Sequence, residues 1–342
     1  MGKCLVTKLN GSCNNDELLK IGEGVVNITS VSNPSKATQG FLFNFTAAAE
    51  VRIIGDGYFT NESLSDNYGK SKTITNTPVY LSNGDYKLTY NKYKLTKIRS
   101  TDDITPSSTF NNKTTPVEYF KYSKDLMFID CILEGDIANL ANCPNLTYLG
   151  ANYSTNFFGD ISALQNCHSL KSIYAASTKL SGDIRVFSGK NEVATVYLEG
   201  TKVYGDISAF ANNPALILLY LNKTSCNGDI SSLKGCSKLE TLYLENSNIT
   251  GDAAVLPAST HFLSANYLKL SWSSRPSSSK IISIENGIFG DSVDKMLQDQ
   301  AQCQISSSGK KLIAVTGTRT SASDSAVQAL QSKGYTVSIT PA

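Results

Sequence analysis

This chain of 342 residues has almost no excess of positive or negative charge, only two histidines and no long apolar run. Charged residues make up 18%, and 31 Lys and Arg against 29 Asp and Glu leave a formal net charge of +2. This balance provides no electrostatic basis for binding nucleic acid. No run of about 18 apolar residues could span a bilayer, and the opening MGKCLVTKLNGS lacks the apolar core of a secretory signal. We therefore expect no nucleic-acid partner, no membrane insertion and folding in a cytosol.

Metal-binding and nucleophilic residues are equally sparse. Two histidines, His168 and His261, accompany eight cysteines without a C-x-x-C pair. These are too few for a zinc site and place no base beside a nucleophile. The sequence predicts buried free thiols, no cofactor, no metal, no catalytic residue and no enzymatic activity. A glycosidase would need only two carboxylates, but no enclosed cleft is indicated around any pair.

What the chain has instead is a repeat. Gly-Asp pairs have their glycines at 135, 159, 182, 205, 228 and 251, with spacings of 24, 23, 23, 23 and 23. Apolar residues lie twelve, nine, seven and two positions before the later glycines, as in Leu239, Leu242, Leu244 and Ile249. Such a period indicates a solenoid.

The aspartates of these pairs are open to three interpretations, namely caps of a turn, a metal column or a catalytic row. We favour structural caps, because Gly permits a turn after a short strand and Asp accepts backbone N–H groups at the start of a 3₁₀ turn. Stacked solvated carboxylates would instead repel one another. The residues are Asp136, Asp160, Asp183, Asp206, Asp229 and Asp252.

The pattern L-x-x-L-x-L-x-x-(T/S)-x-L resembles the leucine-rich repeat family over roughly residues 120–270, and we expect the solenoid domain to comprise residues 116–275. The Asn ladder of that family is replaced by hydroxyl residues, which we expect to bond the backbone of the neighbouring turn. They are Thr155, Thr178, Thr201, Thr224 and Ser247. The resemblance implies a solenoid with a short parallel β-sheet, whose concave face is where such proteins bind partners.

Tyrosine recurs on the expected concave strands, at Tyr174, Tyr197, Tyr220 and Tyr243. Parallel pairing should place these rings in one stripe about 4.8 Å apart. Tyrosine combines an apolar face with a polar tip, which suits recognition of glycans or proteins, although an aromatic ladder also stabilises adjacent strands. The candidate ligand-binding residues are these four together with Glu199, Asn222, Lys223 and Glu245.

The flanking segments differ from the repeat. Residues 1–115 contain short alternating runs separated by turn signals, which predict an antiparallel β-sandwich. Residues 276–342 read strand, helix, strand, helix, strand, and we expect this α/β segment to extend and cap the solenoid sheet. Within it, TGTRTS lacks the glycine spacing and the lysine of a phosphate-binding loop, so no nucleotide site is expected.

The opening MGKCLVTKLNGSCNNDELLKIGEGVVNIT and the closing GTRTSASDSAVQALQSKGYTVSI resemble proteins of gut Bacteroidales and their tailed phages, in which a β-rich head precedes leucine-rich repeats. The resemblance implies a non-enzymatic virion structural protein, such as a fibre, a capsid decoration or a tail-associated adhesin. Its N-terminal domain would attach to other virion proteins in a multicopy or homo-oligomeric assembly, and its repeats would contact a host glycan or protein. The alternative is a bacterial cell-surface leucine-rich repeat adhesin or interaction protein.

Overall fold

The computed structural model describes residues 117–341, apart from 122, 125, 308 and the side chain of residue 119, together with the backbone of the strands in residues 23–116. The chain forms two units. The first unit comprises residues 1–158 and 166–169, and the second comprises residues 159–165 and 170–342.

Strands in residues 23–100 of the first unit pair antiparallel. They are β1 (Glu23–Ile28), β2 (Gly40–Phe45), β3 (Ala49–Gly55), β4 (Ser71–Ile74), β5 (Pro78–Tyr80), β6 (Tyr86–Asn91) and β7 (Leu95–Ser100). One sheet has the order β1-β6-β3-β4, while β2 pairs with β5 and β7. The antiparallel strands agree with the prediction for residues 1–115. The packing that would make them a sandwich lies outside the described residues.

The repeat begins in the first unit with coils built from short strands and 3₁₀ turns. The elements are β8 (Thr115–Pro116), η2 (Val117–Phe120), β9 (Phe128–Asp130), β10 (Leu133–Asp136), η3 (Ile137–Leu140), β11 (Tyr148–Gly150) and β12 (Asn156–Asp160). Parallel pairing joins β8 to β10 and β10 to β12, and it joins β9 to β11.

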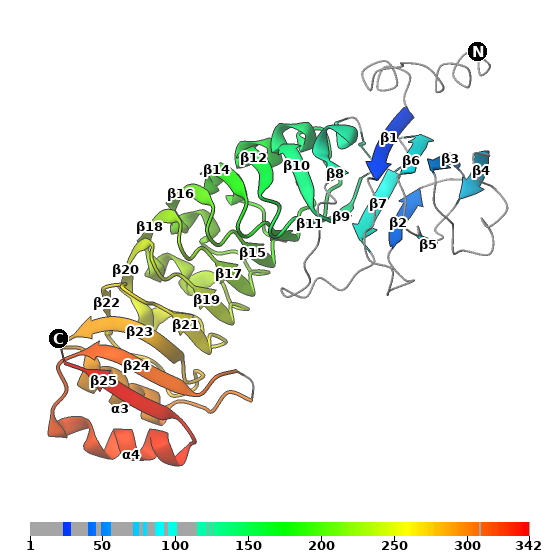
Figure 1. Ribbon diagram of the computed structural model, residues 1–342. Coiled ribbons are helices and arrows are strands. Elements are labelled where there is room, and N and C mark those ends of the chain that lie inside the picture. The colour runs from blue at the N-terminus through cyan, green and yellow to red at the C-terminus, as the bar shows by residue number, and fades with distance from the viewer. Residues whose placement is uncertain are drawn as a thin grey trace. The chain divides into compact units, whose positions relative to one another are not determined.

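Two parallel sheets run through the coils of the second unit (Figure 1). The first sheet contains β13 (Ser172–Tyr174), β15 (Thr195–Tyr197), β17 (Leu218–Tyr220), β19 (Thr241–Tyr243) and β21 (Phe262–Ser264). The second sheet contains β14 (Lys179–Asp183), β16 (Lys202–Asp206), β18 (Ser225–Asp229), β20 (Asn248–Asp252) and β22 (Leu270–Ser271). The 3₁₀ turns are η4 (Ile161–Leu164), η5 (Ile184–Phe187), η6 (Ile207–Phe210), η7 (Ile230–Gly235) and η8 (Ala253–Val255).

The solenoid was predicted, but its second sheet was not. The Gly-Asp pairs that we predicted to be turns lie at the ends of its strands, where Gly182 pairs with Val203 and Gly205 with Cys226. The glycines have positive φ angles, unlike ordinary strand residues. This deviation is local, because the neighbouring residues keep the parallel register. Each coil therefore has a β-strand on both of its broad faces.

The apolar positions of the repeat face the interior of the coils. In the coil containing β17, Leu216, Leu219, Leu221 and Cys226 are all 0% exposed. Burying one such large apolar side chain stabilises the fold by about 1.5–3 kcal/mol. The equivalent residues of the other coils of the second unit are buried as well: Leu170, Ile173, Ala175, Leu180, Val193, Val196, Leu198, Val203, Leu239, Leu242, Leu244 and Ile249.

The Gly-Asp pairs couple each coil to its neighbour. Asp183 Oδ1 accepts a hydrogen bond from Arg185 N and Asp206 Oδ1 accepts one from Ser208 N, both at 2.8 Å, so each carboxylate caps a 3₁₀ turn. Gly205 has a φ of +115°, and a Cβ atom there would lie 2.5 Å from Asp183 Oδ1 of the preceding coil. Both the backbone and the neighbouring carboxylate therefore require glycine. The same cap is made by Asp136, Asp160, Asp229 and Asp252.

The hydroxyl residues bond within their own coil, which corrects the role we predicted for them. Thr178 and Thr201 donate to the carbonyl oxygens three residues earlier, at 2.8 and 2.7 Å, and Thr224 and Ser247 do the same. Each of the four follows a residue in the left-handed region or a glycine with positive φ. The hydroxyl stabilises this tight corner of its own coil. Other side chains donate the hydrogen bonds to the backbone of the neighbouring coil.

Thr155 does not belong to this set. It is exposed, whereas Ser154 is fully buried and its Oγ accepts a hydrogen bond from Leu133 N at 2.9 Å. Tyr153 has the positive φ of the corner, and Ser154 follows it directly. The extra residue of the 24-residue repeat lies after this corner, so counting back from Gly159 selected the wrong residue.

A different column supplies side-chain hydrogen bonds between coils. Lys190, Asn213, Cys236 and Ser259 donate to main-chain carbonyl oxygens of the preceding coil at 3.0, 2.9, 3.1 and 2.8 Å. Cys143 does so in the first unit at 3.5 Å. Ammonium, amide, thiol and hydroxyl groups share only a polar hydrogen. The residue types of this column therefore do not reveal it in the sequence. Only the spacing of 23 residues between its members could have done so.

The described cysteines are free and buried, as predicted: Cys131, Cys143, Cys167, Cys226, Cys236 and Cys303. Burial raises the pKa of Cys143 to about 12 and that of Cys226 to about 11. Because the thiolate is the reactive form of cysteine, these thiols are inert at neutral pH. Cys4 and Cys13 lie outside the described residues.

The C-terminal segment extends the first sheet, as predicted. It contains β23 (Ser283–Gly290), α3 (Val293–Gln302), β24 (Leu312–Gly317), η9 (Ser321–Ser323), α4 (Asp324–Ser332) and β25 (Thr336–Thr340). Its strands follow β21 in the order β23-β24-β25, all parallel (Figure 1). Helices α3 and α4 supply the crossovers that parallel strands require.

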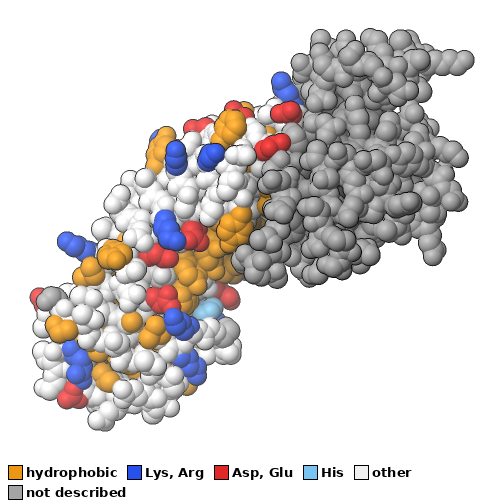
Figure 2. Space-filling view, viewed as in Figure 1, with side chains coloured by type: hydrophobic (Ala, Val, Ile, Leu, Met, Phe, Trp, Pro, Cys, Tyr) orange, Lys and Arg blue, Asp and Glu red, His pale blue; other side chains and the backbone are white. Residues whose placement is uncertain are grey.

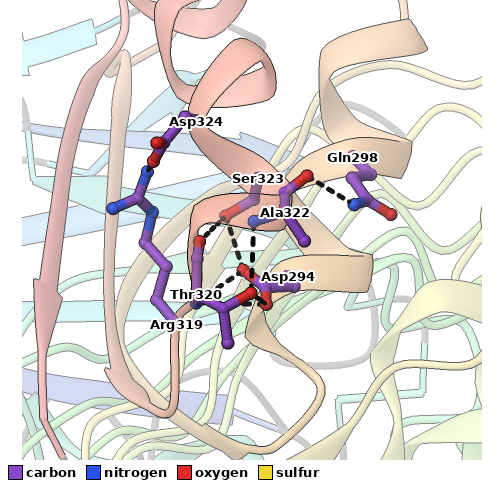
Figure 3. A network of polar contacts seen from close by, with 7 residues as sticks. All are labelled: Asp294, Gln298, Arg319, Thr320, Ala322, Ser323 and Asp324. Carbon is purple, nitrogen blue, oxygen red and sulfur yellow. Dashed lines mark hydrogen bonds and ion pairs between the residues drawn. The ribbon is translucent and has the colours of Figure 1, made fainter.

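The TGTRTS loop after β24 is held by a carboxylate (Figure 3). Asp294, in the first turn of α3, accepts hydrogen bonds from Thr320 N at 3.1 Å, from Thr320 Oγ1 at 2.5 Å and from Ser323 Oγ at 2.6 Å. Arg319 pairs with Asp324. Thr320 and Ser323 thus already donate to a carboxylate of the protein.

Arg275 closes the last coil from within. It is 3% exposed, and its guanidinium donates to the carbonyl oxygens of residues 254, 256, 257, 260 and 280 at 2.9–3.3 Å. Its backbone N–H and Trp272 Nε1 both donate to Asp299 Oδ2 on α3. Burial lowers the pKa of Arg275 to about 10, so the side chain remains charged at neutral pH. One side chain therefore satisfies five main-chain carbonyl oxygens at the end of the repeat.

Candidate recognition surface

Four tyrosines form one column on the first sheet, which we call the tyrosine ladder: Tyr174, Tyr197, Tyr220 and Tyr243. Parallel register places each directly beside the next. Ring centroids are 6.2, 4.5 and 4.4 Å apart along the column, and the last two rings are stacked at 17°. The residue beside Tyr243 on the next strand is Ser264, but the ring of Phe262, two residues earlier, lies 4.9 Å from the ring of Tyr243 and extends the row of aromatic rings. The sequence did not predict this addition, because Phe262 lies outside the 23-residue spacing of the tyrosines.

Two phenol groups of the ladder, those of Tyr220 and Tyr243, have raised pKa values. Burial raises the pKa of Tyr220 to about 12, and the nearby Tyr243, Tyr174 and Glu199 add to the shift. The pKa of Tyr243 is also raised, mainly by burial. The ladder therefore offers hydroxyl groups that can donate as well as accept hydrogen bonds, above partly buried aromatic rings.

Charged side chains border the ladder. Glu199 accepts a hydrogen bond from the Tyr197 hydroxyl at 3.4 Å and pairs with Lys223 Nζ at 2.9 Å. This contact raises the pKa of Lys223. Further along the sheet Lys310 pairs with Glu285 at 2.5 Å. Figure 2 shows acidic and basic side chains next to a band of hydrophobic ones over strands β15 to β21. Exposed ion pairs of this kind add little stability, about 0–1 kcal/mol each.

The remaining predicted residues, Asn222 and Glu245, lie in the same row as Glu199, one position per coil. Asn222 is 2% exposed. Its Oδ1 atom and Glu245 Oε2 are both buried, and neither accepts a hydrogen bond from any described residue. The eight candidate ligand-binding residues thus lie on adjoining coils along the ladder, although Asn222 is buried beneath the surface and is not exposed on it.

The described residues contain no group of three or more His, Cys, Asp and Glu side chains that could hold a metal ion. His261 is buried with Nδ1 3.4 Å from Ser259 O, and His168 is exposed on the opposite part of its coil. None of the helices in the described part of the chain has the length and apolar content needed to cross a bilayer.

Comparison with known proteins gives similarities of structure alone. No protein-family model matches the chain, and no curated protein does. Internalin C2 from Listeria monocytogenes is 24% identical over 52% of this chain and 75% of its own, with a TM-score of 0.39.

The plant peptide hormone receptor RGFR1, solved in complex with RGF2, is 18% identical over 60% of this chain, with a TM-score of 0.39. This chain covers 38% of that receptor. A plant ice-binding protein is 18% identical over 56% of this chain and 68% of its own, with a TM-score of 0.38. At these TM-scores the similarities add nothing to what the repeat geometry itself establishes, which is a solenoid of the leucine-rich repeat type.

Proposed function

We propose that this chain is a non-enzymatic recognition protein, and that the tyrosine ladder binds a glycan or a protein on a host cell surface. The observation that carries the proposal is the ladder itself, a run of partly buried aromatic rings bordered by Glu199 and Lys223. Aromatic faces stack on sugar rings and are enriched in protein interfaces. A ladder that served only the sheet would need neither the adjoining charges nor unsatisfied acceptors.

In this proposal the protein is a structural component of a phage virion, such as a fibre, a capsid decoration or a tail-associated adhesin. The resemblance of the opening and closing segments to proteins of gut Bacteroidales and their tailed phages supports this assignment. Residues 1–115 would attach to other virion proteins, and many copies per particle would convert weak single-site binding into avidity. A bacterial cell-surface adhesin is the alternative.

Mass spectrometry of purified phage particles from a gut Bacteroidales culture tests the virion assignment. We expect this chain at a fixed, high copy number per particle. Its absence from particles, together with its presence on cells, would favour the cell-surface adhesin.

Binding of the full chain to a glycan array and to host surface protein tests the ladder separately. We expect Tyr197→Ala with Tyr220→Ala to abolish the binding. Tyr204→Ala is the matched control, because Tyr204 is 49% exposed on the second sheet, and it should bind as the wild type does. Unchanged binding by the double variant would remove the ladder as the site.

A further inference from the structure

Two buried oxygen atoms beside the tyrosine ladder receive no hydrogen bond from the residues that the structure describes. They are Oδ1 of Asn222, a residue 2% exposed, and Oε2 of Glu245. A buried acceptor left without a donor costs about 1–3 kcal/mol. Nearly all buried polar groups in folded proteins have a partner, so two such atoms in one place indicate that the partner is supplied from outside.

The two residues occupy the same position in successive coils. Leu221 N donates to Tyr243 O and Lys223 N donates to Glu245 O, both at 2.9 Å, so the parallel register continues past the strands on both sides of this row. Neighbouring parallel chains lie about 4.8 Å apart. The two residues therefore lie side by side on adjacent coils, and Tyr220 and Tyr243 of the ladder precede them by two residues on the same coils.

The charges around the pair favour a cation. Lys223 is paired with Glu199 and Lys310 with Glu285, which leaves Glu245 without an ion-pair partner among the described residues. Asn222 adds a second acceptor and no charge. Glu245 also attracts Lys223 and helps to raise the pKa of that lysine, but three carboxylates, Glu199, Glu245 and Glu285, face only two ammonium groups, Lys223 and Lys310. The pair thus presents two acceptors in a row with an excess of one negative charge, at a place where burial strengthens the attraction for a positive donor.

We propose that Asn222 and Glu245 receive an arginine or lysine side chain of a protein partner that lies along the tyrosine ladder. The inference rests on the proposed function, since it requires the ladder face to be a recognition surface. A guanidinium has five N–H donors in a planar fork and can bond both oxygens. Its aliphatic stem can pack on the tyrosine rings. A sugar hydroxyl would satisfy the acceptors but leave the charge of Glu245 unbalanced.

Selection from a random heptapeptide library on the immobilised full chain tests the inference. We expect the retained peptides to be enriched at least threefold in Arg or Lys at one position. The same selection on Glu245→Gln, which keeps the shape and removes the charge, should lose that enrichment. Glu192→Gln is the matched control, because Glu192 is an exposed carboxylate paired with Lys171, and it should retain the enrichment.

Fluorescence anisotropy with one selected peptide then measures the coupling between the basic residue of the peptide and Glu245. Replacing its basic residue by citrulline should weaken binding to the wild type about tenfold, which corresponds to about 1.4 kcal/mol, and should have no further effect on Glu245→Gln. Equal losses on both proteins would refute the inference. So would binding that disappears in EDTA and returns with calcium, because a metal ion would then occupy the pair.

The outcomes separate this inference from the proposed function. Peptides that lack basic residues, yet fail to bind the Tyr197→Ala and Tyr220→Ala double variant, would overturn the basic side chain and keep the ladder as the site. Retention of glycans without any peptide would do the same. If neither peptides nor glycans bind, both proposals fail.

Discussion

Replacing Gly205 by alanine should destabilise the solenoid far more than the addition of one methyl group does at an ordinary loop glycine. At a φ of +115° a residue with a side chain is strained, which costs about 1–3 kcal/mol. The new Cβ would also lie 2.5 Å from Asp183 Oδ1 and 3.2 Å from Ile184 Cγ1. Overpacking of this kind costs a further 1–3 kcal/mol or so. We expect a total loss of about 2–6 kcal/mol.

Gly189→Ala separates the two contributions. Gly189 also has a positive φ, +76°, but nothing lies within 4 Å of the position that a Cβ would take. This control should therefore lose only the backbone part, about 1 kcal/mol. The double variant Asp183→Ala with Gly205→Ala should recover part of the loss, because it removes the carboxylate that the methyl group meets.

Urea unfolding followed by far-UV circular dichroism measures these differences in the free energy of unfolding. If Gly205→Ala and Gly189→Ala lose the same free energy of unfolding to within about 0.5 kcal/mol, the contact with Asp183 is not the reason why position 205 requires glycine. If Gly205→Ala does not fold, refolding of the double variant provides the same test.

Three further predictions concern the cap, the corner and the ladder. Arg275→Met should destabilise the last coil by about 3–5 kcal/mol, because buried carbonyl oxygens lose their hydrogen-bond donor. Urea unfolding followed by Trp272 fluorescence measures this loss. A loss below about 1 kcal/mol would contradict the prediction. Ser154→Ala should cost about 1–2 kcal/mol because Leu133 N loses its acceptor, while Thr155→Ala should be nearly neutral in the same urea assay; equal effects would contradict the assignment. Tyr220 has a folded pKa of about 12 against about 10 in the unfolded chain. Between these values the unfolded state binds fewer protons than the native state, so stability should fall as pH rises from 10 to 12. Tyr220→Phe should remove part of that fall in urea titrations at pH 9 and pH 11.5, and identical slopes for both proteins would rule out the shift.

Several elements could be predicted because they depend on positions that recur. The inward Leu, Ile and Val residues, the Asp caps and the tyrosine column all follow from the 23-residue period, since each coil repeats the environment of the one before. The column of Lys190, Asn213 and Cys236 follows the same period but escaped prediction. Its members share a hydrogen-bond donor and not a residue type, so a search by chemical similarity passes over them.

Other features depend on contacts between residues that no local pattern relates. The guanidinium of Arg275 reaches carbonyl oxygens up to 21 residues away, and Asp294 reaches the loop at Thr320. The hydroxyl assignment failed at Thr155 for a related reason, because one inserted residue shifted the count and only burial identifies Ser154 as the equivalent.

The sequence by itself determined the repeat, the buried face of each coil and the alignment of four tyrosines, because stacking equivalent positions requires nothing beyond a fixed period. The tertiary structure alone decided three further features: each coil carries a second strand, Glu199 forms an ion pair with Lys223, and, among the described residues, Glu245 forms no ion pair and the buried Asn222 Oδ1 has no donor. These properties depend on which side chains of neighbouring coils meet across about 5 Å. A period gives the position of a residue in its coil, whereas its hydrogen bonds and its burial follow from the side chains packed against it.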